Sequence, residues 1–275
     1  MYSSGMAFAR LNGCVTIPLG ASMTPCGRRP QTLALLGVLL VHVLVVGASS
    51  CDGDRRHEVS SLDPTREAER NHMVDADIIP RGITDPAVLA AMRRVPRHRF
   101  VPAEYTRVAY MDGPLPIGHG QTISQPSLVA KMTEALALQK TDKVLEVGTG
   151  SGYQAAVLAE LAAQVLTVEI LEPLARQAEQ TLVELGYRNV RVRVGDGYQG
   201  WPEKAPFNAI IVTAAPEHVP QPLLNQLAVN GRLILPVGTF SQTLDLYRRT
   251  PDGYEHQTLG LVRFVPLVRP GPQEK

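Results

Sequence analysis

The chain has 275 residues, 44% of them hydrophobic, and its charged residues sum to a formal net charge of only +1. This length and composition predict one folded domain with a sizeable core, together with an extension. A near-neutral charge argues against a nucleic-acid partner, because such proteins usually present a basic face, and it favours a small-molecule or protein substrate. All three cysteines lie at or before Cys51, so the rest of the chain has no cysteine for a disulfide, a thiolate metal site or a nucleophile.

The first 51 residues have the pattern of an export signal. Arg28 and Arg29 precede the apolar run Leu33–Ala48, and small residues then lead directly to Cys51. A basic flank, an apolar run shorter than the roughly 20 residues of a membrane span and a small-residue exit are typical of a secretory signal. The junction resembles a bacterial lipoprotein cleavage site with Cys51 as the lipidated residue, although Ala48 stands where leucine is usual. The pattern predicts a protein of the cell envelope or periplasm.

Other interpretations of this front end stay open. The apolar run is also compatible with an uncleaved anchor helix. Translation from Met23 would leave a more compact signal, whereas translation from Met73 would cut through the first predicted helix. Residues 52–63 are polar and lack hydrophobic periodicity, which predicts a tether. The folded domain is expected over residues 64–270, followed by a short tail at 271–275.

The folded body begins with helical patterns. The first predicted helix spans Pro64–Ile79, and a second spans Pro86–Met92 behind the capping residue Asp85. Val101–Gly120 is rich in Pro and Gly and has no steady period, so we expect an ordered loop there. A further helix is expected over Ser127–Leu138, which places its apolar residues on one face.

From residue 144 onward, apolar strands alternate with helices. This alternation predicts an α/β fold, a doubly wound, mostly parallel sheet of the Rossmann-like kind with helices on both faces. The predicted strands are Val144–Val147, Val165–Val168, Val190–Val194, Ala209–Val212, Leu233–Leu235, Leu244–Tyr247 and Leu261–Val265, and the predicted helices are Tyr153–Leu161, Pro173–Leu185 and a stretch near Leu223–Leu227.

Acidic and glycine-rich positions follow three successive strands. The segment from Glu146 to Gly152 reads Glu-Val-Gly-Thr-Gly-Ser-Gly, Glu169 ends the next strand, and Asp196 ends the third. Ligands of doubly wound sheets bind at the carboxyl ends of the strands, where glycines let the backbone approach and a following acid accepts the ribose hydroxyls. A carboxylate at Asp196 is placed to reach an adenine amino group. The pattern predicts a site for an adenosyl-type cofactor.

The spacing Glu-x-Gly-x-Gly-x-Gly resembles the cofactor motif of S-adenosylmethionine-dependent methyltransferases. Gly150 to Ala155 also satisfies the dinucleotide pattern with alanine last, so an NAD-dependent oxidoreductase is kept as a distant alternative. Methyltransferases that act on base amino groups carry Asn/Asp-Pro-Pro-Tyr/Phe after the fourth strand to hold a flipped base. This chain has Thr213-Ala-Ala-Pro216 there, which disfavours a base as the target.

The body resembles the protein-L-isoaspartate O-methyltransferase family over nearly all of residues 64–268. The segment Leu115–Pro126, LPIGHGQTISQP, and the closing RFVPL are specific to that family, whereas the glycine turn is shared with many methyltransferases. The other matching segments are Val95–Val101, Val144–Tyr153, Gly195–Gly197, Phe207–Pro216 and Gly231–Gly238.

The resemblance implies methyl transfer from S-adenosyl-L-methionine to the α-carboxylate of an L-isoaspartyl residue in a damaged protein or peptide. The ester then closes to a succinimide, which starts repair. The resemblance also implies that Ser124 is the active-site hydroxyl and that Val262–Leu267 help to frame the peptide. The residues it assigns to the cofactor are Thr122, Ile123 and Gln125 beside it, Glu146, Gly148 and Gly150 lining it, Glu169 on the ribose, and Asp196 with Gly197 at the adenine.

These residues fit that chemistry. A carboxylate is already ionised near neutral pH, so its attack on a methyl group needs no general base. The protein has to position it and exclude water. We predict that Ser124 orients the carboxylate by a hydrogen bond, because no His–Asp pair is evident that would make it a nucleophile. The alternative is that Ser124 caps the following helix, and His119, between two glycines, is expected to be structural or solvated.

Two features depart from the family pattern. Asn208 stands where aspartate is usual, and we expect this change to have a minor effect. The larger departure is the export signal, because the family is usually cytosolic, where its methyl donor is made. A cytoplasmic location is therefore an alternative, as is an envelope-anchored protein that binds S-adenosylmethionine without catalysis.

Overall fold

The computed structural model describes residues 66–269. The expected export signal, the tether, the first residues of the helix predicted from Pro64 and the tail at 271–275 lie outside the described residues. Within the described range, no helix is both long enough and apolar enough to cross a bilayer.

A continuous helical segment opens the described chain, close to the prediction. α1 (Glu67–His72) runs into a π-helical turn, Met73–Ile78, and then into a 3-10 turn, Ile79–Arg81. The segment ends at Gly82, whose φ of 87° is left-handed and therefore suits glycine.

The next two helices differ from their predictions only at their ends. α2 (Pro86–Arg94) ends two residues after Met92, and its cap is confirmed because the Asp85 carboxylate accepts hydrogen bonds from two N–H groups of the first turn. α3 (Pro126–Ala135) ends before the predicted Leu138, since Ala137 has a left-handed φ of 45°.

The prediction of a loop without elements over Val101–Gly120 was wrong. The segment contains a 3-10 helix, Ala103–Val108, and strand β1 (Leu115–Gly118), which pairs antiparallel with β2 (Gln121–Ile123). These strands are too short, and β1 is interrupted by a proline, so hydrophobic alternation could not reveal them. The hairpin carries the family-specific segment.

A seven-stranded sheet forms the centre of the described chain, in the order β5-β4-β3-β6-β7-β8-β9. The strands from β5 to β7 are parallel, and β8 and β9 are antiparallel additions. The predicted mostly parallel, doubly wound sheet is thus confirmed. The bounds are β3 (Lys143–Val147), α4 (Tyr153–Ala159), β4 (Gln164–Glu169), α5 (Glu172–Glu184), β5 (Val190–Val194), β6 (Phe207–Val212), α6 (Gln221–Asn225), β7 (Leu227–Val237), β8 (Gln242–Thr250) and β9 (Gly253–Val262).

The last part of the sheet corrects the sequence predictions. β7 is much longer than the predicted Leu233–Leu235, and it already begins at Leu227, which was assigned to the preceding helix. The strand predicted over Leu261–Val265 was wrong, because β9 ends at Val262 and most of its length lies before the prediction. Most residues of β9 are exposed, so the strand has no apolar run in the sequence.

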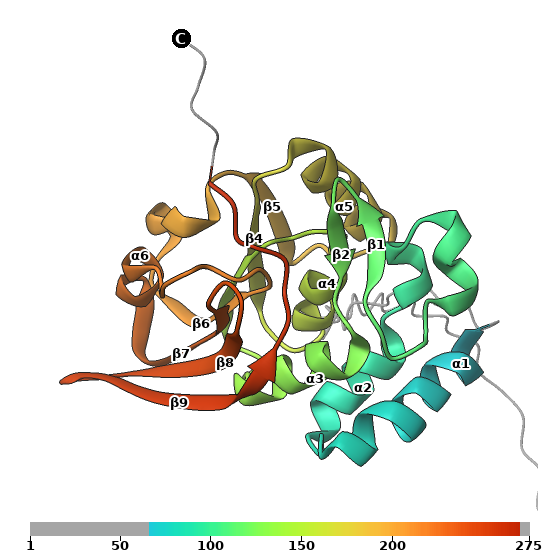
Figure 1. The fold of residues 1–275 in the computed structure, drawn as a ribbon, viewed down its shortest axis with the longest axis horizontal. Helices are drawn as coiled ribbons and strands as arrows, with labels where there is room; N and C mark the ends of the chain where they lie inside the picture. The colour runs from blue at the N-terminus through green and yellow to red at the C-terminus, as the bar shows by residue number, and fades with distance from the viewer. Residues whose placement is uncertain (1–65, 270–275) are drawn as a thin grey trace, which may run out of the picture. The chain divides into compact units, whose positions relative to one another are not determined.

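Alternate residues of the central strands enter two cores, one on each face of the sheet. Val144 of β3 and Ile211 of β6 pack with the residues of α2 to α5. Leu145 and Ile210 enter the other core, with the leucines of α6. In Figure 1 the β8–β9 hairpin projects at one side of the view and α1 lies at the other.

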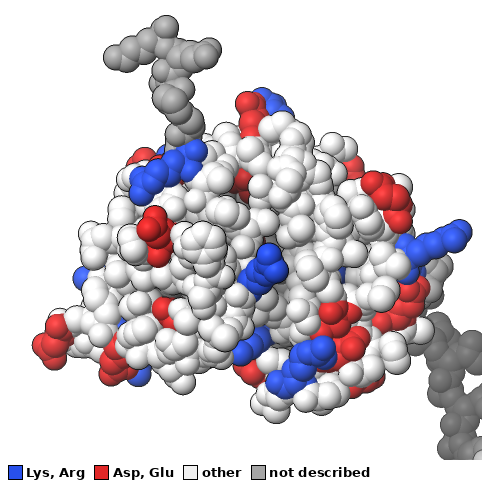
Figure 2. Space-filling model, viewed as in Figure 1, with Lys and Arg blue, Asp and Glu red and all other residues white. Residues whose placement is uncertain are grey.

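The winding of the sheet reverses between β3 and β6. β3 pairs with β4 on one side and with β6 on the other, so crossovers from this point run in opposite directions and leave a crevice at the carboxyl ends of the two strands. The face seen in Figure 2 carries scattered charges of both signs and no continuous patch of Lys and Arg among its described residues.

Candidate active site

The glycine turn lies at this crevice, directly after β3. Gly148 has a left-handed φ of 95°, and a Cβ there would lie 2.5 Å from Oγ1 of Thr213, which follows β6. The Thr213 hydroxyl donates to the Gly148 carbonyl at 2.6 Å. Glycine is therefore required at this position both by its backbone conformation and by the close approach of the next strand.

The two acids predicted for the cofactor lie at neighbouring strand ends. Glu169 is the last residue of β4, and its carboxylate accepts hydrogen bonds from the N–H groups of Gly150 at 2.8 Å and Leu171 at 3.0 Å. Asp196 follows β5 and accepts from the Tyr198 N–H at 2.9 Å. Beside it, a Cβ on Gly197 would lie 2.5 Å from Cγ1 of Val147. Both carboxylates are thus fixed at the edge where a ligand of the sheet binds.

A narrow cavity of about 50 Å³ lies at these strand ends, lined by Thr122, Gly148, Gly150, Glu169 and Gly197 among others. Ligand sites usually measure a few hundred Å³. Residues 265–268 also line the cavity, and backbone hydrogen bonds to Ala215 hold this segment in place. The Tyr198 hydroxyl donates to the Leu267 carbonyl at 3.1 Å and adds a further link. The 265–268 segment therefore forms one wall of the narrow cavity.

Glu146 lies beneath the turn and is fully buried. Neither carboxyl oxygen has a hydrogen-bond partner among the described residues. The nearby Thr167 hydroxyl is paired with that of Thr149 at 2.6 Å. Burial raises the pKa of Glu146 from 4.5 to about 8; Thr167 opposes the rise and the charge of Glu169 adds to it. A buried carboxyl without a hydrogen-bond partner lowers the stability of the fold. Groups of this kind are typical of functional sites.

These features fit an S-adenosylmethionine site. The two glycine positions leave no room for a Cβ, two carboxylates stand at successive strand ends, and one buried carboxyl lacks a partner. In such a site Glu169 would hold the ribose, Asp196 and Gly197 would lie at the adenine, and the buried Glu146 would stand directly before the glycine turn. Of the residues that the sequence assigns to the cofactor, Ile123, Glu146 and Asp196 line neither cavity, and Ile123 packs in the core.

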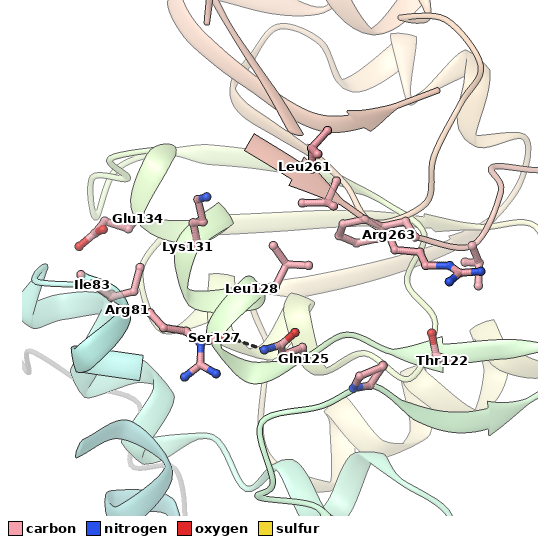
Figure 3. Close-up of a pocket in the computed structure, with 15 residues that line it drawn as sticks. Arg81, Ile83, Thr122, Gln125, Ser127, Leu128, Lys131, Glu134, Leu261 and Arg263 are labelled. Atoms are coloured by element: carbon pink, nitrogen blue, oxygen red, sulfur yellow. Dashed lines mark hydrogen bonds between the residues drawn. The ribbon is translucent and has the colours of Figure 1, made fainter. Parts of the chain in front are cut away.

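A much larger cavity of about 780 Å³ adjoins the narrow one (Figure 3). Thr122 and Val265 line both cavities. We call the larger one the groove. Its walls come from the start of α3 on one side and from the end of β9 with the residues that follow it on the other, and its charged lining residues are Arg81, Lys131, Glu134 and Arg263.

Ser124 itself lines neither cavity, although Thr122 and Gln125 on either side of it in the sequence line the groove. It is half-buried, and its hydroxyl has no hydrogen-bond partner among the described residues. The alternative role as a helix cap is excluded, because Gln125 occupies the cap position of α3 and the first N–H groups of that helix receive no cap from Ser124. The hydroxyl is therefore available for a ligand.

The remaining polar residues singled out in the sequence have structural explanations. His119 forms the β1–β2 turn with a left-handed φ of 52°, and His218 is exposed beside Glu217. The Asn208 amide oxygen accepts a hydrogen bond from the Lys143 N–H at 2.9 Å. An aspartate would accept the same bond, which agrees with the minor effect expected for this departure.

Sequence reasoning missed two residues of the site. Thr213 was considered only as part of a missing base-binding motif, although its hydroxyl holds the glycine turn. Asp112 lies in the segment predicted as a loop, yet its side chain contacts the start of α3. A polar residue directly after a central strand was a usable signal for Thr213, whereas nothing in the local sequence pattern distinguished Asp112.

Comparison with known proteins places the chain in a family. Residues 68–271 match the family model for protein-L-isoaspartate(D-aspartate) O-methyltransferase. The chain is 65% identical over 204 residues to the protein-L-isoaspartate O-methyltransferase of Gloeobacter violaceus, which covers 74% of this chain and all of that protein. A solved protein-L-isoaspartate O-methyltransferase is similar at 30% identity and a TM-score of 0.67, over 72% of this chain and 65% of that one. A Plasmodium falciparum protein described as a methyltransferase of this kind, solved with S-adenosyl-L-homocysteine, is similar at 26% identity and a TM-score of 0.63, over 72% and 98% of the two chains. The chain therefore belongs to the protein-L-isoaspartate(D-aspartate) O-methyltransferase family.

Proposed function

We propose that the protein transfers a methyl group from S-adenosylmethionine to the α-carboxylate of L-isoaspartyl residues in damaged proteins and peptides. Family membership supports this activity. The observation that carries it is the junction of two cavities, because Thr122 and Val265 line both the narrow cavity with the glycine turn and the open groove. A cofactor in the first would meet a peptide in the second at this junction.

In this reaction the main task of the protein is to position the substrate carboxylate relative to the methyl donor. The bound cofactor supplies a methyl group on a positively charged sulfur. The substrate carboxylate is ionised near neutral pH and attacks without a general base. Ser124 lies two residues after Thr122, which lines both cavities, and its unpaired hydroxyl would donate a hydrogen bond that orients the carboxylate. The segment at 265–268 and the β1–β2 hairpin would exclude water from the reacting groups.

The test is methyl ester formation on a synthetic isoaspartyl peptide, with the aspartyl isomer as the comparison. We expect transfer to the first peptide only, and equal transfer to both would refute the specificity. Ser124→Ala should lower kcat by about tenfold or more through the lost hydrogen bond while the affinity for S-adenosylhomocysteine stays unchanged. Ser241→Ala, at an exposed serine, is the matched control. Cofactor binding without any transfer would instead indicate a binding protein that lacks catalysis.

The location of the protein belongs to the same proposal. The basic flank, the apolar run Leu33–Ala48 and Cys51 support export to the cell envelope with lipid attachment at Cys51. The cytoplasm is the alternative, because an exported enzyme would need its methyl donor outside the compartment that makes it. Mass spectrometry of the mature N-terminus distinguishes the two: an intact N-terminal segment would refute export through a cleaved signal.

A further inference from the structure

Asp112 is a buried carboxylate that has no part in the reaction described above and that contacts several residues lining the groove. The Asp112 side chain is only 5% exposed. It accepts hydrogen bonds from the Gln125 amide at 2.7 Å and from the Ser127 N–H at 2.8 Å and hydroxyl at 2.9 Å. Arg81 pairs with it at 2.8 Å. Oδ2 takes three of these contacts and Oδ1 takes the bond from the Ser127 N–H, so Asp112 is held by three neighbouring residues.

The three residues that contact Asp112 all line the groove. Arg81 comes from the helical segment before Gly82, and Gln125 and Ser127 come from the start of α3, so Asp112 ties two separate walls together. It also supplies the cap that α3 lacks, because the Gln125 side chain makes no capping bond and the Ser127 N–H is bound by Asp112 instead.

Asp112 also determines which way the Gln125 amide faces. An ionised carboxylate only accepts hydrogen bonds, so the NH₂ group of Gln125 must face it. The second N–H of that group donates to the Ser127 hydroxyl at 3.0 Å. The amide oxygen accepts no hydrogen bond from the described residues, and Figure 3 shows it on the side away from Ser127, toward Leu128, another lining residue of the groove.

We infer that Asp112 is a positioning residue for the peptide: it holds the Gln125 oxygen toward the groove, where that oxygen accepts a hydrogen bond from a backbone N–H of the substrate. The inference rests on the proposed function. Gln125 is then a peptide contact, in place of the cofactor contact that the family resemblance implied. Gln125 directly follows Ser124, so the hydrogen bond from the peptide N–H to the Gln125 oxygen would also position the peptide relative to the Ser124 hydroxyl.

The test replaces the carboxylate at position 112 by an amide and then, in a second variant, also the amide at position 125 by a carboxylate. Asp112→Asn replaces two acceptor oxygens by one acceptor and one donor, so the Gln125 amide is no longer held in one orientation and can present NH₂ to the groove. KM for an isoaspartyl peptide should rise about tenfold, the effect of one lost hydrogen bond at a site built for it, and the affinity for S-adenosylhomocysteine should not change. In the double variant Asp112→Asn with Gln125→Glu, an acceptor faces the groove again, so KM should return to within about threefold of the wild-type value.

Two further variants separate this role from a structural one. Asp245→Asn is the matched control. Asp245 is also a buried carboxylate that accepts a hydrogen bond from a hydroxyl and contacts the His256 side chain, but it does not line the groove. Gln125→Met leaves Asp112 its bonds to Ser127 and Arg81, so it keeps the fold if Asp112→Asn does not, and it should raise KM in the same way.

The outcomes distinguish the inference from the function on which it rests. An unchanged peptide KM in Asp112→Asn or Gln125→Met, no recovery in the double variant, or a parallel loss of cofactor affinity would each overturn the role of Asp112 while the wild-type enzyme still methylates the peptide. A wild-type protein without methyl transfer would overturn the proposed function, and this inference with it.

Discussion

Glu146 gives a quantitative test of the cofactor site in the ligand-free protein. Its folded-state pKa of about 8 lies above the ordinary value of 4.5. Between these two pH values the folded protein keeps a proton that the unfolded chain has lost, so stability falls as pH rises through this window and levels off above it. Below about pH 4.5 both states are protonated and the carboxyl carries no such cost.

The magnitude follows from the same two values. Each pH unit within the window costs about 1.4 kcal/mol, so at about pH 7 the fully buried Glu146 disfavours folding by up to about 3 kcal/mol. Glu146→Gln has nearly the same shape and cannot ionise. For a domain of this size the gain corresponds to about 6–12 °C in melting temperature near neutral pH, and the gain should vanish near pH 4.5.

The assay is thermal unfolding of both proteins across this pH range, with Glu179→Gln, at an exposed position on α5, as the control. A Glu146→Gln variant with the same pH dependence as the wild type would refute the reasoning, because it would mean that the carboxyl is ionised in the folded state. We also expect Glu146→Gln to bind S-adenosylhomocysteine more weakly by calorimetry. A carboxyl that costs stability in the free protein would thus be retained for the cofactor.

Three other predictions follow from single contacts. Gly148→Ala should reduce S-adenosylhomocysteine affinity at least about tenfold, because alanine is strained at a φ of 95° and meets Thr213; Gly113→Ala, with open space around it, should bind normally in the same titration. Arg97→Met should lower the free energy of unfolding in urea by about 2–3 kcal/mol, since the buried guanidinium donates to the Ala109 carbonyl at 2.8 Å and that acceptor would lose its partner; an unchanged midpoint would contradict this. Tyr198→Phe removes the tie to Leu267 and should speed the release of S-adenosylhomocysteine about fivefold in stopped-flow measurements, whereas an unaltered rate would show that this bond does not limit opening.

The parts of the fold that the sequence predicts well are those in which each strand is buried on both faces. Val144–Val147 and Ala209–Val212 are buried runs bounded by turn residues, so their positions could be read directly. β9 could not, because its residues are mostly exposed and it is held by backbone pairing with β8. The β1–β2 hairpin was missed for a related reason, since its short strands are fixed by their turn and their partners.

The candidate site divides in the same way. Gly148, Glu169 and Asp196 sit at regular positions after successive strands, so spacing along the chain predicts that they meet. Asp112 acts on residues 13 to 15 positions further along and on Arg81, in a segment without periodicity. Contacts of this kind depend on how a loop packs against a helix start, and no local pattern specifies them.

Asp112 contacts Gln125, the residue after Ser124, yet Ser124 and Asp112 should respond to substitution in different ways. The Ser124 hydroxyl has no partner among the described residues, so its removal should leave stability unchanged and appear only in the rate of methyl transfer. Asp112 accepts three hydrogen bonds, pairs with Arg81 and caps α3, so its replacement should lower both stability and peptide affinity. A hydroxyl that contributes nothing to the free protein is free to bind a substrate carboxylate, whereas a carboxylate already held by three neighbouring residues acts through the residues it holds.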